Sequence, residues 1–172
     1  MKTLTRSQLL YRDVPELDTP RFIFSDVATA ADVMPGTLKA WLSRDPPIVP
    51  LGPYDRPGRG KGIPRLFTLR RVYAIAMTAE LISLGFVASK AGNLAFAFTD
   101  LPFEGQDDRL VQASGPLFLV ANAKHELFNF LTSPGIKLDQ LIGAETIVSC
   151  AVIDCAALMA RVRESLRKRG AL

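Results

Sequence analysis

The sequence predicts an α+β protein, in which a mainly helical N-terminal part is followed by a small α/β region near the C-terminal end. Apolar residues between Phe24 and Phe98 recur at the spacing of amphipathic helices. Further along, Ile147–Ile153 is rich in apolar and β-branched residues, which is typical of a strand buried on both faces. The expected units are an N-terminal arm (1–21), a helical domain (22–98), a linker (99–115) and a small α/β domain (116–172).

Composition narrows the class of protein. The 172 residues are 48% hydrophobic, which suits a packed core and argues against wholesale disorder. No apolar run reaches the length of a membrane span, and the first residues lack the apolar segment of a signal peptide. Two cysteines do not make a disulfide framework. We expect a cytoplasmic protein without a membrane partner.

The helical part is expected to begin with two short helices joined by a tight turn. Ser25 can cap the first helix, whose apolar positions Val27, Ala28 and Ala31 share one face. Pro35 is well placed to start the second helix, because proline is tolerated at the first helical position.

This second helix has two contrasting faces. Leu38, Trp41 and Leu42 are expected to point inward. The outward positions carry small or polar residues, namely Gly36, Thr37, Lys39, Ala40 and Ser43. Two helices of about two turns, joined in this way, form the helix-turn-helix unit that fits the major groove of DNA.

A loop rich in glycine and proline follows and is expected to form a wing. Ile48–Leu51 predicts a short strand that pairs with Arg65–Phe67, and the intervening Gly52–Pro64 holds four glycines and three prolines. Gly58–Gly62 does not match a nucleotide-binding P-loop, which needs a glycine where Asp55 stands and Ser or Thr after the lysine.

Positive charge is concentrated on this loop and just after it. Residues 1–100 hold 13 basic and 9 acidic residues, so the whole net charge of +4 lies in this N-terminal part of the chain. Six basic residues and no acid fall between positions 56 and 71, namely Arg56, Arg59, Lys61, Arg65, Arg70 and Arg71. A basic run is more often a solvated face than a binding site, but a run at wing spacing favours contact with the phosphate backbone of DNA.

Two longer helices are expected after the wing. Thr68 is a good N-cap for a helix over residues 69–84, and Gly85 can end it in the left-handed conformation. Residues 87–98 predict a further helix.

Arg70 and Arg71 would lie in the first turn of the first of these helices, where the helix dipole does not favour a cation. Their position is explained equally well by an external phosphate or by a salt bridge to an acid such as Asp26 or Glu80.

In the order and spacing of these elements, the chain resembles the MerR family of winged helix-turn-helix regulators. The resemblance covers about residues 22–98 and rests on four motifs: Phe24-Ser-Asp-Val-Ala28, Thr37-Leu-Lys-Ala-Trp-Leu42, Arg65-Leu-Phe-Thr-Leu-Arg-Arg-Val72 and Glu80-Leu-Ile-Ser-Leu-Gly-Phe86. It implies a recognition helix followed by a wing and two further helices, and binding to duplex DNA. The sequence departs from the family in its long Pro/Gly-rich wing and in lacking a long dimerising helix afterwards.

The C-terminal region reads as strands followed by a helix. Leu117–Ala121 predicts a strand, and Glu126–Leu131 predicts either its hairpin partner or a short helix. Asp154 can cap a helix over Cys155–Lys168 that follows the strand Ile147–Ile153. This strand needs more cover than the region itself provides, so we expect packing against the helical domain or against a second copy in a homodimer.

Candidate catalytic and metal sites are scarce. His125 is the only histidine, and its surroundings show no pattern of a catalytic triad. Cys150 and Cys155 would need two further ligands to hold zinc, so both are expected to be core thiols. We expect no catalytic residue, no metal and no cofactor, and the sequence is silent on a small-molecule effector.

The function predicted from the sequence is sequence-specific binding of double-stranded DNA by a transcription regulator that acts as a homodimer at the nucleoid. Helix 37–44 would enter the major groove and the wing would contact phosphates. The expected DNA-binding residues are Gly36, Thr37, Lys39, Ala40, Ser43, Arg44, Arg56, Arg59, Lys61, Arg65, Arg70 and Arg71. The alternatives are a phage- or recombination-type accessory protein, similar to excisionases or small terminase subunits, and a protein-interaction module.

Overall fold

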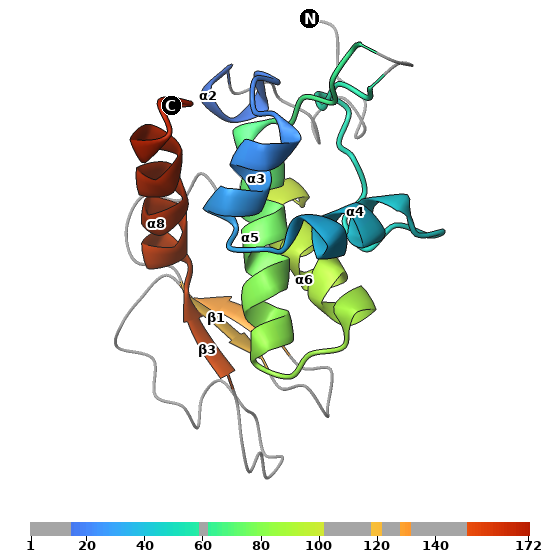
Figure 1. Cartoon of the computed structure of the whole chain (residues 1–172). Helices are drawn as coiled ribbons and strands as arrows, with labels where there is room; N and C mark the ends of the chain where they lie inside the picture. Colours follow the sequence, from blue (N-terminus) through green and yellow to red (C-terminus); the bar gives the residue numbers. More distant parts are fainter. Residues whose placement is uncertain (1–14, 59–61, 102–117, 122–127, 132–150) are drawn as a thin grey trace, which may run out of the picture.

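The computed structural model describes residues 15–58, 62–101, 118–121, 128–131 and 151–172. Within these residues, helices make up most of the molecule and a small sheet lies at one end of it (Figure 1). The elements are α2 (Pro15–Asp18), α3 (Phe24–Ala30), α4 (Pro35–Ser43), α5 (Leu69–Ser83), α6 (Ala88–Asp100), β1 (Phe118–Ala121), β2 (Phe128–Leu131), β3 (Ala151–Asp154) and α8 (Cys155–Lys168). The broad α+β class expected from the sequence therefore agrees with the structure.

Helix α5 occupies the centre of the molecule, with α3, α6 and α8 around it (Figure 1). All side chains from Leu69 to Thr78 are buried, because neighbours cover this part of the helix on every side. Its N-cap is Thr68, whose hydroxyl accepts a hydrogen bond from the Arg71 amide at 3.2 Å. Gly85 follows the helix with a φ of 92°. The helix predicted over 69–84, its N-cap and its left-handed glycine are thus confirmed.

The three described strands form one antiparallel sheet in the order β2-β1-β3. Residues 128–131 pair with β1, so of the two structures considered for this segment the hairpin strand is found. Leu119 of β1 lies opposite Ile153 of β3, and both side chains are buried. Val152, the neighbour of Ile153, is 56% exposed, so this described part of the strand is buried on one face only. Residues 147–150 lie outside the described part of the chain.

Helix α8 begins directly after β3 and packs against α3 and α5. Its N-cap is Asp154, whose carboxylate accepts a hydrogen bond from the Ala157 amide at 2.9 Å, as the sequence predicts. The buried side chains of α8 belong to the same core cluster as those of the N-terminal helices. The helical part of the chain therefore supplies cover for the C-terminal elements.

Polar contacts from α8 reinforce this packing. Arg169 reaches α3, where its Nε lies 3.2 Å from a carboxylate oxygen of Asp26. Arg163 pairs with Glu16 and donates to the hydroxyl of Tyr73 on α5 at 2.6 Å. Burial raises the pKa of this tyrosine despite the neighbouring guanidinium.

Two helices overlap the expected N-terminal arm and linker. Residues 15–18, assigned to an N-terminal arm, form α2, which docks through the buried Leu17 and Asp18. Residues 99 and 100, assigned to the linker, are the last turn of α6, where Thr99 and Asp100 are buried. In both helices an acidic residue pairs with an arginine of α5, Asp18 with Arg70 and Asp100 with Arg71. Residues 1–14 and 102–115 lie outside the described part.

The strand pairing expected at the base of the wing is also wrong. Residues 48–51 are not a strand; the Ile48 amide donates to the Trp41 carbonyl at 2.9 Å. The Ile48 carbonyl lies so close to α6 that a Cβ on Gly92 would stand 2.1 Å from it. Residues 65–67 pair elsewhere, because the fully buried Phe67 bridges to Phe22.

Candidate nucleic-acid interface

Helix α4 buries one face and exposes the other, as the sequence predicts. Leu38 is fully buried and Trp41 is 8% exposed, so these two side chains hold the helix on the core. The opposite face is solvent-exposed and carries Gly36, Thr37, Lys39, Ala40 and Ser43. Nothing in the described part of the chain covers this face, and it is available to a partner.

The N-terminal end of α4 is open as well. Pro35 is the first residue of the helix, as expected, and the N-cap position is taken by Met34, which makes no side-chain cap. The Gly36 and Thr37 residues that follow are both exposed. Free amide groups at a helix N-terminus attract anions, because the helix dipole adds to their own partial charge.

The preceding helix differs from its prediction at its start. α3 begins at Phe24 with Ile23 as the N-cap residue, and Ser25 lies within the first turn. The cap is supplied instead by Asp26, whose carboxylate accepts a hydrogen bond from the Ile23 amide at 3.2 Å. Serine at position 25 is therefore not the N-cap that the sequence indicated.

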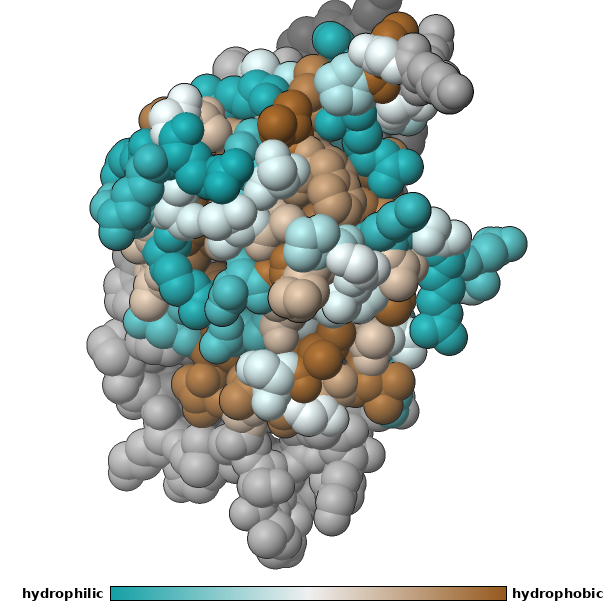
Figure 2. All heavy atoms as spheres, viewed as in Figure 1, coloured by the Kyte–Doolittle hydropathy of each residue, from teal (hydrophilic) through white to brown (hydrophobic). Residues whose placement is uncertain are grey.

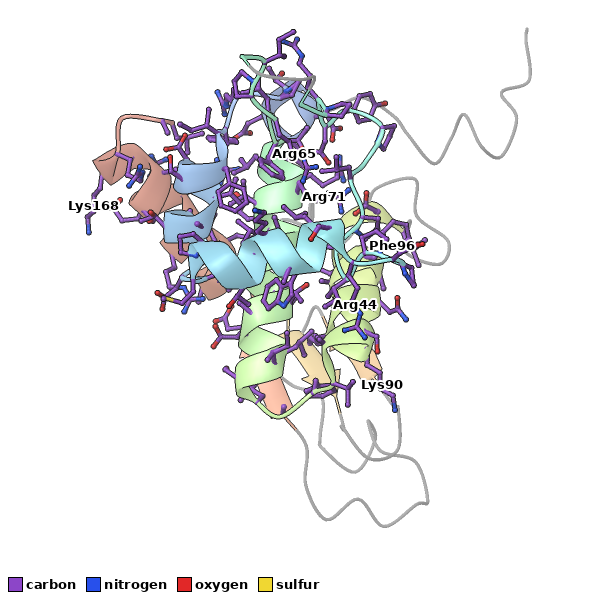
Figure 3. All side chains as sticks on the ribbon, turned by 45° about the vertical axis from the view of Figure 1, so that its right-hand side comes forward. Arg44, Arg65, Arg71, Lys90, Phe96 and Lys168 are labelled. Carbon is purple, nitrogen blue, oxygen red and sulfur yellow. The ribbon has the colours of Figure 1, made fainter. Side chains whose placement is uncertain are left out.

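Three exposed or half-buried cations follow the helical residues of α4 in the chain. One lies at the C-terminal end of α4 and two lie on the loop between α4 and α5. Arg44 is the C-cap residue of α4, and Arg56 is exposed and bridges through its backbone to Leu66. Arg65 is half-buried. Figure 3 shows Arg65 and Arg44 on opposite sides of α4. Within the described ranges, no carboxylate lies within 4.0 Å of the charged groups of Arg44, Arg56, Arg65 or Lys39. Arg59 and Lys61, also expected to bind DNA, lie outside the described residues.

Arg70 and Arg71 are buried in salt bridges, which favours the salt-bridge alternative for them over an external phosphate. Their exposed fractions are 3% and 1%. Arg70 forms a two-pronged salt bridge with Asp18, with N–O distances of 2.6 and 2.8 Å, and donates to the Thr99 carbonyl. The salt-bridge alternative is right in kind, but the acids named for it, Asp26 and Glu80, are bound by arginines of α8.

Arg71 completes a buried polar cluster with Asp55 and Asp100. Its Nε lies 3.0 Å from Asp55 and its Nη2 lies 3.2 Å from Asp100. Asp55 also accepts hydrogen bonds from the Gly52 amide at 2.7 Å and from the Thr68 amide at 2.8 Å. The cluster holds the loop before Arg56 against the start of α5 and the end of α6. It therefore fixes the position of the backbone from which the exposed Arg56 side chain extends.

Sequence reasoning missed these carboxylates, although a signal for one of them existed. Asp55 directly precedes the basic run from 56 to 71, and it is the acid that neutralises the end of that run. Asp18 stands 52 residues before Arg70 in the chain, and no local pattern connects them.

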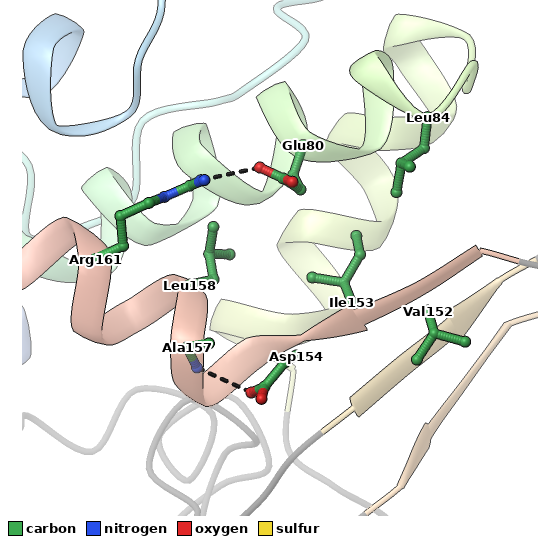
Figure 4. Close-up of a pocket in the computed structure, with 8 residues that line it drawn as sticks. All are labelled: Glu80, Leu84, Val152, Ile153, Asp154, Ala157, Leu158 and Arg161. Atoms are coloured by element: carbon green, nitrogen blue, oxygen red, sulfur yellow. Dashed lines mark hydrogen bonds and ion pairs between the residues drawn. The ribbon is translucent and has the colours of Figure 1, made fainter.

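The described residues also form a shallow pocket of about 290 Å³ where α5 ends near β3 and α8 (Figure 4). Its apolar lining includes Leu84, Val152 and Leu158, and Arg161 bonds to Glu80 at its rim at 2.9 Å. Figure 2 shows hydrophobic residues at this lower end of the molecule, below the hydrophilic surface over α3 and α8. The carboxylates in its described lining are engaged within the protein, Glu80 with Arg161 and Asp154 with the Ala157 amide.

Groups with potential chemical reactivity are few in the part of the chain that the structure describes. It contains no cluster of three His, Cys, Asp or Glu residues that could hold a metal ion. Cys155 is a free, buried thiol, as expected of a core cysteine, and burial raises its pKa to about 12. His125 and Cys150 lie outside the described residues. No helix among those described is long and apolar enough to cross a membrane.

Comparison with known proteins identifies no family for this chain. No protein-family model matches the chain, and no curated protein sequence matches it significantly.

Proposed function

We propose that this protein binds double-stranded DNA as a winged helix-turn-helix transcription regulator of the MerR type. One observation carries the proposal: α4 presents an exposed face of small and polar residues while Leu38 and Trp41 hold its other face, and Arg44 and Arg65, which have no carboxylate partner among the described residues, lie on either side of it (Figure 3). A short helix exposed in this manner, after another short helix and a tight turn, has the dimensions that fit the major groove.

In this arrangement α4 lies in the major groove. Lys39 is placed to donate to a guanine and Ala40 to contact a thymine methyl group. The open N-terminus of α4 receives one phosphate, and Arg44, Arg56 and Arg65 contact others on either side of the groove. Arg59 and Lys61 would extend the same basic loop.

A homodimer is part of the proposal, because two copies would place two such helices on neighbouring half-sites about one helical turn apart. The protein would then act in the cytoplasm, associated with the nucleoid. An effector site is not part of the proposal.

The test is the salt dependence of DNA binding by the full chain, measured by fluorescence anisotropy with a labelled duplex. With about four phosphates per protomer, a dimer should show a slope of log affinity against log salt of about −7. Arg56→Ala combined with Arg65→Ala should flatten this slope by about 3 to 4, because each protomer loses two phosphate contacts.

A matched control removes the same charge elsewhere. Arg167→Ala with Lys168→Ala neutralises two exposed cations in the last turn of α8, and it should leave the slope unchanged. Equal slopes for both double variants would refute the assigned surface. A chain without salt-sensitive DNA affinity would refute DNA binding and favour a protein-interaction module.

A second candidate is a recombination or packaging accessory protein that uses the same surface. The scarcity of hydrogen-bonding side chains on the exposed face of α4 favours it, since such a protein needs less readout of base sequence. It predicts a ladder of complexes on long DNA in gel-shift experiments, whereas a dimeric regulator predicts one discrete band.

A further inference from the structure

The exposed face of α4 offers few groups that can read the edge of a base. Gly36 and Ala40 have no polar side-chain atoms, which leaves Thr37, Lys39 and Ser43. The Ser43 hydroxyl donates its proton to the Lys39 carbonyl at 2.8 Å, so that proton is already used within the helix. The nine residues Pro35–Ser43 contain no Arg, Asn or Gln, so Lys39 is the one residue among them of a type that makes two hydrogen bonds to one base.

The groups suited to phosphates are more numerous. Arg44 and Arg56 are exposed, Arg65 is half-buried, and no acid within the described ranges neutralises them. The uncapped N-terminus of α4 adds amide groups that attract an anion. Phosphate contacts raise affinity for every sequence and carry no direct sequence information.

Magnitudes decide between these two kinds of contact. A good two-bond contact discriminates against a wrong base by about 5- to 150-fold. A lysine places a single compact charge and lacks the rigid fork of arginine, so Lys39 belongs at the lower end of that range. Proteins that bind one DNA site specifically prefer it by about 10³ to 10⁷ over other DNA.

We therefore propose that the partner is duplex DNA recognised mainly by its phosphate backbone, and that one protomer prefers its best site by less than about 1,000-fold. This inference rests on the proposed DNA-binding function. Selective placement on DNA then requires both protomers of the proposed homodimer to bind adjacent half-sites, because the weak preferences of the two copies multiply.

The experiment compares affinities of the full chain for a random duplex pool and for the best duplex found by in vitro selection. Each duplex should be short enough to hold one protomer, and the salt concentration should be the same. A ratio below about 1,000 is expected, and a larger ratio would overturn the inference while leaving DNA binding intact. Absence of salt-sensitive binding to either duplex would refute the proposed function itself, and the inference with it.

Lys39→Arg supplies a variant that gains function and keeps the charge. It introduces the missing fork into α4, and it should raise the preference for guanine at one position by about 5- to 150-fold. Arg44→Lys is the matched control, with an equal charge at the end of the helix and no expected change in the selected sequence. An unchanged preference in Lys39→Arg would show that this face does not meet base edges; that result would refute the placement of α4 in the major groove and would support recognition by the backbone.

Discussion

Arginines of one basic run differ sharply in burial and in ion pairing. Arg56 is exposed and Arg65 half-buried on the loop before α5, without an acidic partner among the described residues. Arg70 and Arg71, only a few positions later, are almost completely buried in salt bridges. Residue type and local charge are the same in both pairs, so the difference must come from what the fold brings next to them.

Acids from distant segments make that difference. Asp18 lies in α2 and Asp100 ends α6, and both are carried to the start of α5 by the packing of those helices. A buried guanidinium is tolerated only where carboxylates compensate for its lost hydration. The basic run therefore divides into a structural half and a half that remains available to an external anion.

The largest effect is expected from Arg71→Ala. Removing this guanidinium leaves Asp55 and Asp100 buried without their counter-charge, which should lower the free energy of unfolding by about 3 to 5 kcal/mol. Urea unfolding followed by circular dichroism measures the change. Arg56→Ala is the matched control from the exposed half and should cost no more than about 0.5 kcal/mol. Similar costs for both variants would contradict the division between the two halves.

Not every buried ionisable group has a counter-charge among the described residues, as Arg71 has. Cys155 is buried like Arg71, but only the penalty of burial acts strongly on it, and this raises its pKa from 9.0 to about 12. Its contribution to stability is therefore fully present below pH 9 and is lost as the pH rises from about 9 through about 12, because the unfolded thiol ionises first.

Thiol reactivity measures this difference directly. At pH 9, a thiol reagent should modify Cys155 much more slowly in the folded chain than in urea, since the thiolate is the reactive form. Cys150→Ser should be used as the background so that only one thiol reports. Equal rates in folded and unfolded protein would show that the thiol is not buried.

Much of the helical framework follows from local sequence, whereas the ionic core does not. Thr68, Pro35 and Asp154 mark helix starts through chemistry confined to a few neighbouring residues, and the structure has helices beginning at or just after each of them. The two faces of α4 likewise follow from helical spacing. The burial of Arg70 depends on Asp18, which local patterns cannot connect to it.

The wing shows the same limit for backbone pairing. Ile48–Leu51 has the composition of a strand, but the backbone of Ile48 packs against α6 at Gly92, and that contact is visible only in three dimensions. Arg65–Phe67 pairs instead with Arg56 and Phe22, because burying Phe22 against Phe67 removes two aromatic side chains from water. Local strand propensity yields to tertiary packing here.

The smallest effect is expected for a salt bridge of the exposed kind. At the rim of the pocket, Nη2 of Arg161 lies 2.9 Å from Oε2 of Glu80, and the two side chains are 53% and 35% exposed. Water already solvates both ions there, so a double-mutant cycle with Arg161→Ala and Glu80→Ala should give a coupling of only about 0.2 to 1 kcal/mol. High salt should reduce this coupling further, because the pair is open to screening ions. A coupling as large as the loss predicted for Arg71→Ala would mean that charge pairing, and not burial, governs the strength of these bridges.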